Sequence, residues 1–284
     1  MADLATTRSG HAAWPVDDGL TAARRRRLSL GASARWLPVG ILLAVLVSWE
    51  ALSRAGVISS ILFPAPSAVA RTLWESIVDG VLPSHLAATL LRVIPGLALG
   101  GLAGMLLGLA MGASRRLRLA IDPFVAAIHP MPKITLLPLL MIFFGIGEAS
   151  KVLVVAIAAF FPMLINTMAG VRQISPLYFE VVESYGASRR KIFSRVLLPG
   201  SMPMMLSGVR LSANVAFLIT IAVEILAAER GLGALIWLSW EILRIDLLYA
   251  AMAVTAMVGL AINVGLYRLA TKVVPWQIDR EPFR

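Results

Sequence analysis

The chain has 284 residues, of which 58% are apolar and only 15% are charged, compared with about 25% charged residues in a typical soluble domain. Together with a mean hydropathy of +0.82, this composition excludes an ordinary soluble protein and predicts an integral membrane protein. The net charge of +10 does not indicate nucleic-acid binding, because the basic residues form short clusters at the ends of apolar runs, as membrane topology requires. The absence of cysteine excludes disulfides and thiol chemistry.

Residues 1–35 are polar and basic and show no apolar periodicity, and they include the run Arg24 to Arg27. This composition predicts a disordered cytoplasmic tail. An arginine run before an apolar segment is also typical of a cleavable signal peptide. Because the apolar segment continues to about residue 55 and several comparable segments follow it, we interpret it as a retained first membrane helix.

Several apolar segments are long enough to cross a bilayer core, which takes roughly 20 residues per helix. They cover residues 37–55, 86–112, 124–147, 151–170, 204–228 and 248–270. Lysine and arginine gather in alternate connections, and the positive-inside rule makes those connections and both termini cytoplasmic. We therefore predict an all-α membrane protein with six spans over residues 36–270 and a cytoplasmic tail over residues 271–284.

The second span carries a glycine at every fourth position from Gly96 to Gly112. This spacing places the glycines on one face of the helix and allows the backbone of another helix to approach closely. The partner is either another helix of the same bundle or a second copy of the chain, and we expect the first.

The third span is interrupted by Pro130, Pro132 and Pro138. Each proline removes a backbone donor and clashes with the preceding turn, so we predict a kinked or broken helix. Non-helical backbone at membrane depth is tolerated only against protein or a watery cavity. Lys133 lies in this interruption, where it either extends to the cytoplasmic headgroups or lines a translocation path.

Other polar residues within the spans are further candidates for such a path, since polar groups at membrane depth are costly unless they have a function or a partner. Glu224 lies near the outer end of the fifth span and either makes a structural hydrogen bond or lines a gate. The asparagines of the spans either bond neighbouring helices or line the path. The complete set of path candidates is Lys133, Asn166, Asn214 and Glu224.

The segment from Glu180 to Pro199 is charged although it lies between apolar spans, so it must lie at an aqueous face. Helical spacing of its apolar residues predicts a short helix that is broken by Gly186. Ser188 is then expected to cap a second helix, which begins at Arg189 and ends at Pro199. A charged amphipathic hairpin of this kind is suited to a groove on a partner protein. The alternative is a helix that rests on anionic lipid.

Glu180, Gly186 and the ending Val196-x-Leu198-Pro199 resemble the EAA loop of ABC importer permeases, with the family's spacing at every position. Valines replace the family's two alanines and its isoleucine. The resemblance covers residues 37–270 and includes the stretches Pro64 to Ser67, Phe143 to Glu148, Phe161 to Thr167 and Glu224 to Gly233. Together they resemble the permeases for aliphatic sulfonates, taurine, nitrate, bicarbonate and related small solutes.

The resemblance implies a six-span type I ABC importer permease with a cytoplasmic coupling hairpin over residues 175–203. It further implies two cytoplasmic ABC ATPase subunits, an extracytoplasmic solute-binding protein, and a second permease, either another copy or a close homologue, in the lipid of a bacterial inner membrane. The residues expected to couple to the ATPase are Glu180, Gly186, Ser188, Arg189, Ile192, Phe193, Val196, Leu198 and Pro199.

The sequence contains no phosphate-binding loop of the form G-x4-G-K-[ST]. ATP and magnesium are therefore expected on the partner ATPase, and this chain is expected to have no catalytic residue, cofactor or metal of its own. The resemblance implies a small anionic solute, moved by alternating access, as the cargo: an aliphatic sulfonate first, then nitrate, taurine or bicarbonate.

Two other function classes compete with an importer permease. A secondary, ion-coupled carrier would use the intramembrane charges as a relay, but the sequence shows no clear internal repeat, and such a carrier has no need of the hairpin. A membrane-embedded enzyme is disfavoured because His11, His85 and His129 are far apart in the sequence and no nucleophile or metal-ligand spacing is visible.

Overall fold

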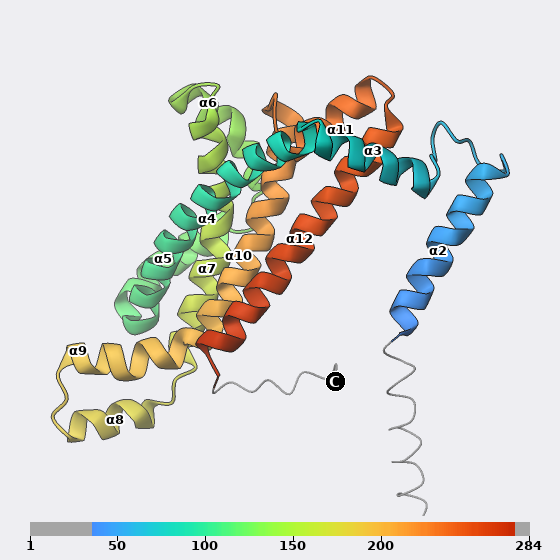
Figure 1. The fold of residues 1–284 in the computed structure, drawn as a ribbon. Coiled ribbons are helices and arrows are strands. Elements are labelled where there is room, and N and C mark those ends of the chain that lie inside the picture. Colours follow the sequence, from blue (N-terminus) through green and yellow to red (C-terminus); the bar gives the residue numbers. More distant parts are fainter. Residues whose placement is uncertain (1–35, 276–284) are drawn as a thin grey trace, which may run out of the picture. The chain divides into compact units, whose positions relative to one another are not determined.

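The computed structural model describes residues 36–275, and all regular structure in this range is helical (Figure 1). Five of the helices are long and apolar enough to cross a membrane, and a sixth span is obtained if one bent helix pair counts as a single crossing. This confirms the predicted all-α membrane fold. The predicted tail over residues 1–35, and most of the predicted C-terminal tail, lie outside the described residues.

The chain divides into two compact units at Pro66. The described part of the first unit is built on helix α2 (Leu37–Arg54), which begins with a proline in its first turn. Within α2, Arg54 pairs with Glu50 one turn earlier at 2.5 Å. The Ser53 hydroxyl donates a hydrogen bond to the Phe63 carbonyl at 2.9 Å, which holds the following loop against the end of the helix.

The second unit is a helical bundle centred on α7. Its elements are α3 (Pro66–Val78), α4 (Val81–Ala113), α5 (Arg115–Ile128), the 3-10 turn η1 (Lys133–Leu136), α6 (Leu137–Phe144), α7 (Glu148–Arg172), α8 (Pro176–Ser184), α9 (Arg189–Ile192), the π-helical turn η2 (Phe193–Leu197), α10 (Leu198–Ala227), α11 (Leu232–Glu241) and α12 (Ile245–Val273). Helix α7 packs between α4 and α10, and its residues Val154 and Leu164 are fully buried.

The glycine face of α4 lies directly against α7. A Cβ atom at Gly96 would lie 2.5 Å from the Val155 side chain, and one at Gly108 would lie 2.6 Å from the Leu164 carbonyl oxygen. At Gly100 a Cβ atom would collide with the Ala156 carbonyl. The glycines therefore allow backbone contact within one bundle, which confirms the packing predicted from their spacing.

The third predicted span is broken, as its prolines indicated. Helix α5 and the η1–α6 segment meet at 92°. Pro132 has no N–H to offer the Ile128 carbonyl, and the Lys133 ammonium donates to this carbonyl at 3.1 Å, to that of His129 at 2.6 Å and to that of Met131 at 2.7 Å. Lys133 is buried and its ammonium is bound to these backbone carbonyls, so the structure does not support the alternative in which it extends to the headgroups.

The hairpin turn follows the prediction. Gly186 has φ +69°, its N–H donates to the Glu183 carbonyl at 2.9 Å, and the Ala187 N–H donates to the Val182 carbonyl at 3.0 Å. These two bonds and the left-handed glycine form a Schellman motif, which ends α8. Glycine adopts this conformation without the steric cost of a Cβ atom.

The second hairpin helix differs from the prediction. It does not end at Pro199: α9, η2 and α10 form one helical run, Arg189–Ala227, of 39 residues. Pro199 lies in the first turn of α10 after the wide π-helical turn, and proline is tolerated in a first turn because its missing N–H is not needed there. Ser188 occupies the N-cap position, as predicted, but its side chain makes no capping hydrogen bond.

Candidate functional site

Two regions at opposite ends of the second unit carry the chemistry of interest. The hairpin of α8 and α9 projects at one end, whereas α11 lies at the other end (Figure 1). Helices α7 and α10 run between these ends (Figure 1).

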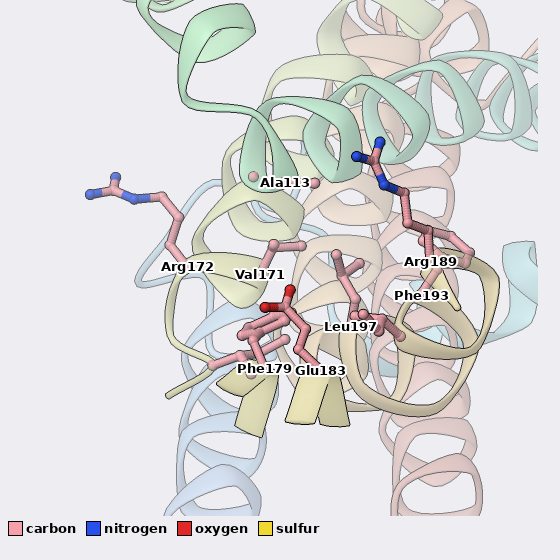
Figure 2. A pocket seen from close by; sticks show the side chains of 11 residues that line it. Ala113, Val171, Arg172, Phe179, Glu183, Arg189, Phe193 and Leu197 are labelled. Carbon is pink, nitrogen blue, oxygen red and sulfur yellow. The ribbon is translucent and has the colours of Figure 1, made fainter. Parts of the chain in front are cut away.

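A cavity of about 610 Å³ separates the hairpin from the bundle. Its lining residues are Gly112, Ala113, Val171, Arg172, Ile174, Phe179, Glu183, Arg189, Ile192, Phe193 and Leu197. Figure 2 shows the Glu183 carboxylate directed into this cavity and the Arg172 guanidinium directed away from it. Three of the predicted coupling residues, Arg189, Ile192 and Phe193, line the hairpin side of the cavity.

The hairpin exposes several large apolar side chains. Tyr185 is 88% exposed, and Leu177, Tyr178, Val181 and Phe193 are also exposed. The coupling candidates Glu180, Gly186, Ser188 and Arg189 are exposed as well, whereas Val196, Leu198 and Pro199 are half-buried where the hairpin enters the bundle. An exposed apolar patch with a charged rim is typical of a surface that binds another protein.

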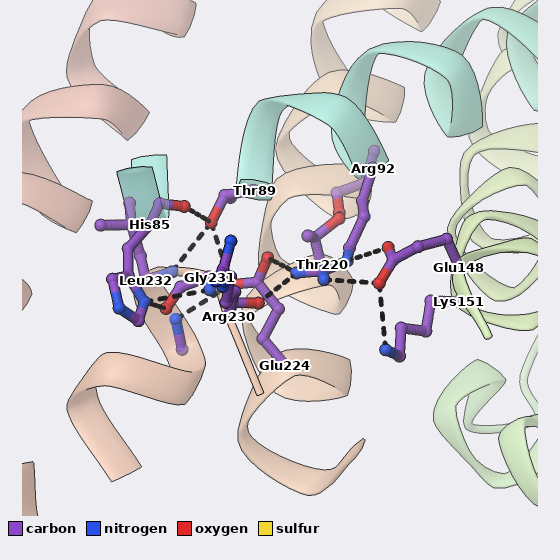
Figure 3. Close-up of polar contacts among 12 residues, drawn as sticks. His85, Thr89, Arg92, Glu148, Lys151, Thr220, Glu224, Arg230, Gly231 and Leu232 are labelled. Atoms are coloured by element: carbon purple, nitrogen blue, oxygen red, sulfur yellow. Dashed lines mark hydrogen bonds and ion pairs between the residues drawn. The ribbon is translucent and has the colours of Figure 1, made fainter. Parts of the chain in front are cut away.

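A buried polar cluster, centred on Glu224 of α10, occupies the opposite end (Figure 3). The side chain of Glu224 is completely buried. The carboxylate accepts hydrogen bonds from Arg92 Nη1 at 2.8 Å and from the Thr89 hydroxyl at 3.0 Å, both on α4. It also accepts the Gly233 N–H at 2.9 Å, at the start of α11. One carboxylate thus joins three helices.

Arg92 extends this polar cluster to the start of α7. Its Nε and Nη2 atoms donate to the two carboxylate oxygens of Glu148 at 2.6 and 2.8 Å, a bidentate arrangement that is among the strongest side-chain pairings. The Glu148 side chain is 61% exposed and also accepts from Lys151 at 3.1 Å. Arg92 Nη1 further donates to the Arg230 carbonyl at 2.6 Å. The charges of the two basic and two acidic side chains balance.

The Gly231-Leu232-Gly233 segment wraps around Glu224. Gly231 has φ +134°, and a Cβ atom there would collide with the Glu224 carboxylate. A Cβ atom at Gly233 would lie 2.8 Å from Glu224 Cβ. The Leu232 N–H donates to the Thr89 hydroxyl at 2.9 Å, and His85 Nδ1 lies 2.8 Å from the Gly231 carbonyl oxygen. This geometry explains why glycine flanks Leu232.

The predicted path residues are not brought together. Glu224 belongs to the polar cluster, and Lys133 lies at the break between α5 and η1, with its ammonium 4.8 Å from the centre of the Phe161 ring. Asn166 donates to the Pro162 carbonyl of its own helix at 2.8 Å. Asn214 of α10 donates to Asn263 of α12 at 3.1 Å. Each side chain therefore has a protein contact, and their assignment to a path remains a prediction.

Sequence patterns identified Glu224 but did not predict the residues that join it in the polar cluster: Thr89, Arg92, Glu148 and Lys151. A signal was present, because Arg92, Glu148 and Lys151 all lie near the same end of predicted spans, as Glu224 does. Ionisable groups at similar membrane depth are candidates for mutual pairing.

The model of the family described as the inner membrane component of binding-protein-dependent transport systems matches residues 100–278. The chain belongs to this family. It is an ABC importer permease, as its hairpin predicted, and the alternative of a secondary carrier finds no support among its relatives. As a permease, it is a transport subunit.

Individual relatives agree with this membership. The permease is 34% identical to the taurine transport system permease protein TauC of Escherichia coli, over 84% of this chain and 89% of that protein. It is 30% identical to the putative aliphatic sulfonates transport permease protein SsuC of Bacillus subtilis, over 87% of this chain and 90% of that protein. It is 32% identical to the riboflavin transport system permease protein RibX of Chloroflexus aurantiacus, over 85% of this chain and 90% of that protein.

A solved structure shows the same fold. A chain of the MetNI methionine ABC transporter in an inward-facing conformation superposes with a TM-score of 0.53 at 18% identity, over 65% of this chain and 94% of that chain. This likeness confirms the type I ABC importer permease fold predicted from the sequence.

Proposed function

We propose that this permease forms the membrane path of an importer for a small anionic solute, with an aliphatic sulfonate as the first candidate. The names of the relatives TauC and SsuC support a sulfonate. Nitrate, taurine and bicarbonate are the next candidates from the sequence resemblance. The name of RibX adds riboflavin to the solutes worth testing.

The proposed assembly contains two copies of this permease, two cytoplasmic ATPase subunits and an extracytoplasmic solute-binding protein, in a bacterial inner membrane. ATP and magnesium are held by the ATPase. The positive-inside rule places the hairpin and both termini in the cytoplasm, and α11 at the outer face. The binding protein then meets the α11 end, and the ATPase meets the α8–α9 hairpin.

The observation that carries this proposal is the continuity between the hairpin and a membrane span. The exposed hairpin turns at Gly186 and leads without interruption into the 39-residue run Arg189–Ala227. The α10 part of this run, Leu198–Ala227, has 30 residues; at 1.5 Å per residue it is roughly 45 Å long, enough to cross the bilayer core. ATP binding that draws two hairpins together would tilt or rotate this helix, which is the movement alternating access requires.

Among the path candidates, Lys133, Asn166 and Asn214 remain proposed lining residues that a movement of α10 would expose or cover. Glu224 is fully buried. It contacts a solute only if its bonds to Arg92, Thr89 and Gly233 break, so its resting role is structural.

The test is purification of the tagged permease from native membranes, with Gly186→Trp compared to the wild type. The matched control is Gly80→Trp at the opposite end, because Gly80 also has a positive φ (+75°) and open space around its Cβ position. We expect an ATPase to accompany the wild type and the control but not Gly186→Trp. Uptake of radiolabelled sulfonate, taurine, nitrate, bicarbonate and riboflavin identifies the cargo. Normal uptake by Gly186→Trp, or uptake without ATP, contradicts the proposal.

A further inference from the structure

We propose that the contact of Arg92 with Glu224 is a fixed joint that couples the hairpin end of the permease to the α11 end. Here Arg92 and Glu224 are positioning residues: they hold helices together and do not bind the solute. The inference rests on the proposed function, because it assigns them a part in transmitting ATPase-driven movement. The inference assigns a function to the segment from Glu224 to Gly233, which the proposed binding of the ATPase to the hairpin leaves without one.

The first step is the continuity of the moving element. Glu224 lies three residues before the end of α10, so it occupies the far end of the run Arg189–Ala227 that begins in the hairpin. A displacement at Arg189 therefore moves Glu224, unless the helix bends between them. The π-helical turn η2 and Pro203 both lie at the hairpin end of the run, and no proline interrupts α10 between Pro203 and Glu224.

The second step is the attachment of Glu224 to its surroundings. Its carboxylate is held by Arg92 and Thr89 of α4 and by the Gly233 N–H of α11. Arg92 also holds the Arg230 carbonyl, which lies in the connection between α10 and α11. A movement of α10 must therefore carry this connection and the start of α11 along with it.

The third step is the rigidity of the other side of the joint. Arg92 is bound to Glu148 at the start of α7 by two hydrogen bonds. Further along α4, its backbone lies in close contact with α7 at Gly96, Gly100 and Gly108, which fixes the two helices against each other. Close-packed surfaces of this kind do not deform continuously, so α4 and α7 act as one body to which the end of α10 is fastened.

The fourth step is the persistence of the joint. Charges removed from water remain ionised and bound only when they are paired and fully hydrogen-bonded. Here the charges of Arg92 and Lys151 are balanced by those of Glu148 and Glu224, and the Arg92 side chain is 5% exposed. Removal of Arg92 would leave the buried Glu224 carboxylate without its counter-charge. The joint is thus expected to stay closed through the transport cycle, and not to open as a gate.

The experiment uses the intact importer, purified with its ATPase and binding protein and reconstituted into vesicles. In Glu224→Gln, the amide retains an oxygen acceptor but loses the charge that pairs with Arg92. The matched control is Glu75→Gln on α3, which breaks the exposed pair of Glu75 with Arg71. We measure the solute molecules imported per ATP hydrolysed and the stimulation of ATP hydrolysis by the loaded binding protein.

We expect Glu224→Gln to assemble with the ATPase and to hydrolyse ATP at the basal rate. Import per ATP should fall by roughly 2- to 30-fold, the range that disruption of a coupling contact produces, and stimulation by the binding protein should fall with it. Glu75→Gln should behave as the wild type. Wild-type import per ATP in assembled Glu224→Gln overturns the inference. Absence of an ATPase from the wild-type preparation contradicts the proposed function instead, so the two failures are distinguishable.

A second variant decides the outcome if Glu224→Gln does not accumulate in the membrane. Thr89→Val keeps the side-chain shape and the Arg92–Glu224 pair, but removes the hydroxyl that donates to Glu224 and accepts from Leu232. We expect correct assembly with a smaller fall in import per ATP. Unchanged import per ATP in Thr89→Val then overturns the inference. A purely structural role would lower the amount of assembled importer but leave this ratio unchanged.

Discussion

The Lys133 ammonium lies 4.8 Å from the centre of the Phe161 ring while it donates to three backbone carbonyls at the end of α5. Cations over aromatic faces are stabilised by the ring quadrupole. Phe161 lies near the middle of α7, so this contact fixes the break between α5 and η1 at mid-bundle. Lys133 thus takes the place of the backbone donor that Pro132 lacks.

Replacement of Lys133 by Met should therefore destabilise the permease. The three carbonyls lose a donor, and a buried acceptor without a partner costs about 1 to 3 kcal/mol. Thermal unfolding of the detergent-solubilised protein measures the effect. Lys272→Met is the control, because Lys272 is exposed near the end of α12. Unchanged stability with reduced transport in Lys133→Met would instead support a path-lining role.

The glycine face of α4 makes a position-specific prediction. Gly100→Ala places a methyl group against the Ala156 carbonyl, whereas Gly101→Ala meets only the Leu97 side chain, 3.9 Å away. Overpacking of a tight interface typically costs about 1 to 3 kcal/mol. We expect Gly100→Ala to lower the melting temperature and the amount of protein in the membrane. Equal stability of the two variants would show that the α4–α7 contact is looser than described.

Substitutions of Gly186 should weaken ATPase binding to a degree that depends on how well the new residue tolerates a positive φ. No atom lies within 4 Å of a Cβ atom at this position, so only its φ of +69° penalises a side chain. The left-handed conformation costs a non-glycine residue about 1 to 2 kcal/mol, and asparagine tolerates it better than alanine. Co-purification of the ATPase should rank wild type above Gly186→Asn, and Gly186→Asn above Gly186→Ala. Stronger retention by Gly186→Ala than by Gly186→Asn would contradict the turn geometry.

The pair of Asn214 and Asn263 predicts a measurable coupling between α10 and α12. Hydrogen bonds between membrane helices contribute about 0.6 kcal/mol on average. A double-mutant cycle with Asn214→Ala and Asn263→Ala should give a coupling free energy of this size in unfolding experiments. If the pair is structural, both single variants should transport alike. A transport defect confined to Asn214→Ala would favour its assignment to the translocation path.

Local sequence patterns were sufficient to predict the membrane class, the approximate spans, the glycine face of α4, the proline break and the hairpin with its turn at Gly186. Each of these follows from local properties: hydropathy over about 20 residues, a four-residue period, or the backbone demands of glycine and proline. The EAA-like residues Glu180, Gly186, Leu198 and Pro199 also lie within one short segment, so their spacing was sufficient to indicate the family.

The pairing of the polar groups, in contrast, depends on how the helices pack together. Arg92 and Glu224 are separated by 132 residues, and their pairing depends on the close packing of α4 and α10 around α7, which no local pattern encodes. Packing also decided that Lys133 caps broken backbone at mid-bundle and that the hairpin helix continues through Pro199 into α10. Hydropathy determines which segments lie in the membrane, whereas the need to pair every buried charge and backbone group determines how those segments fit together.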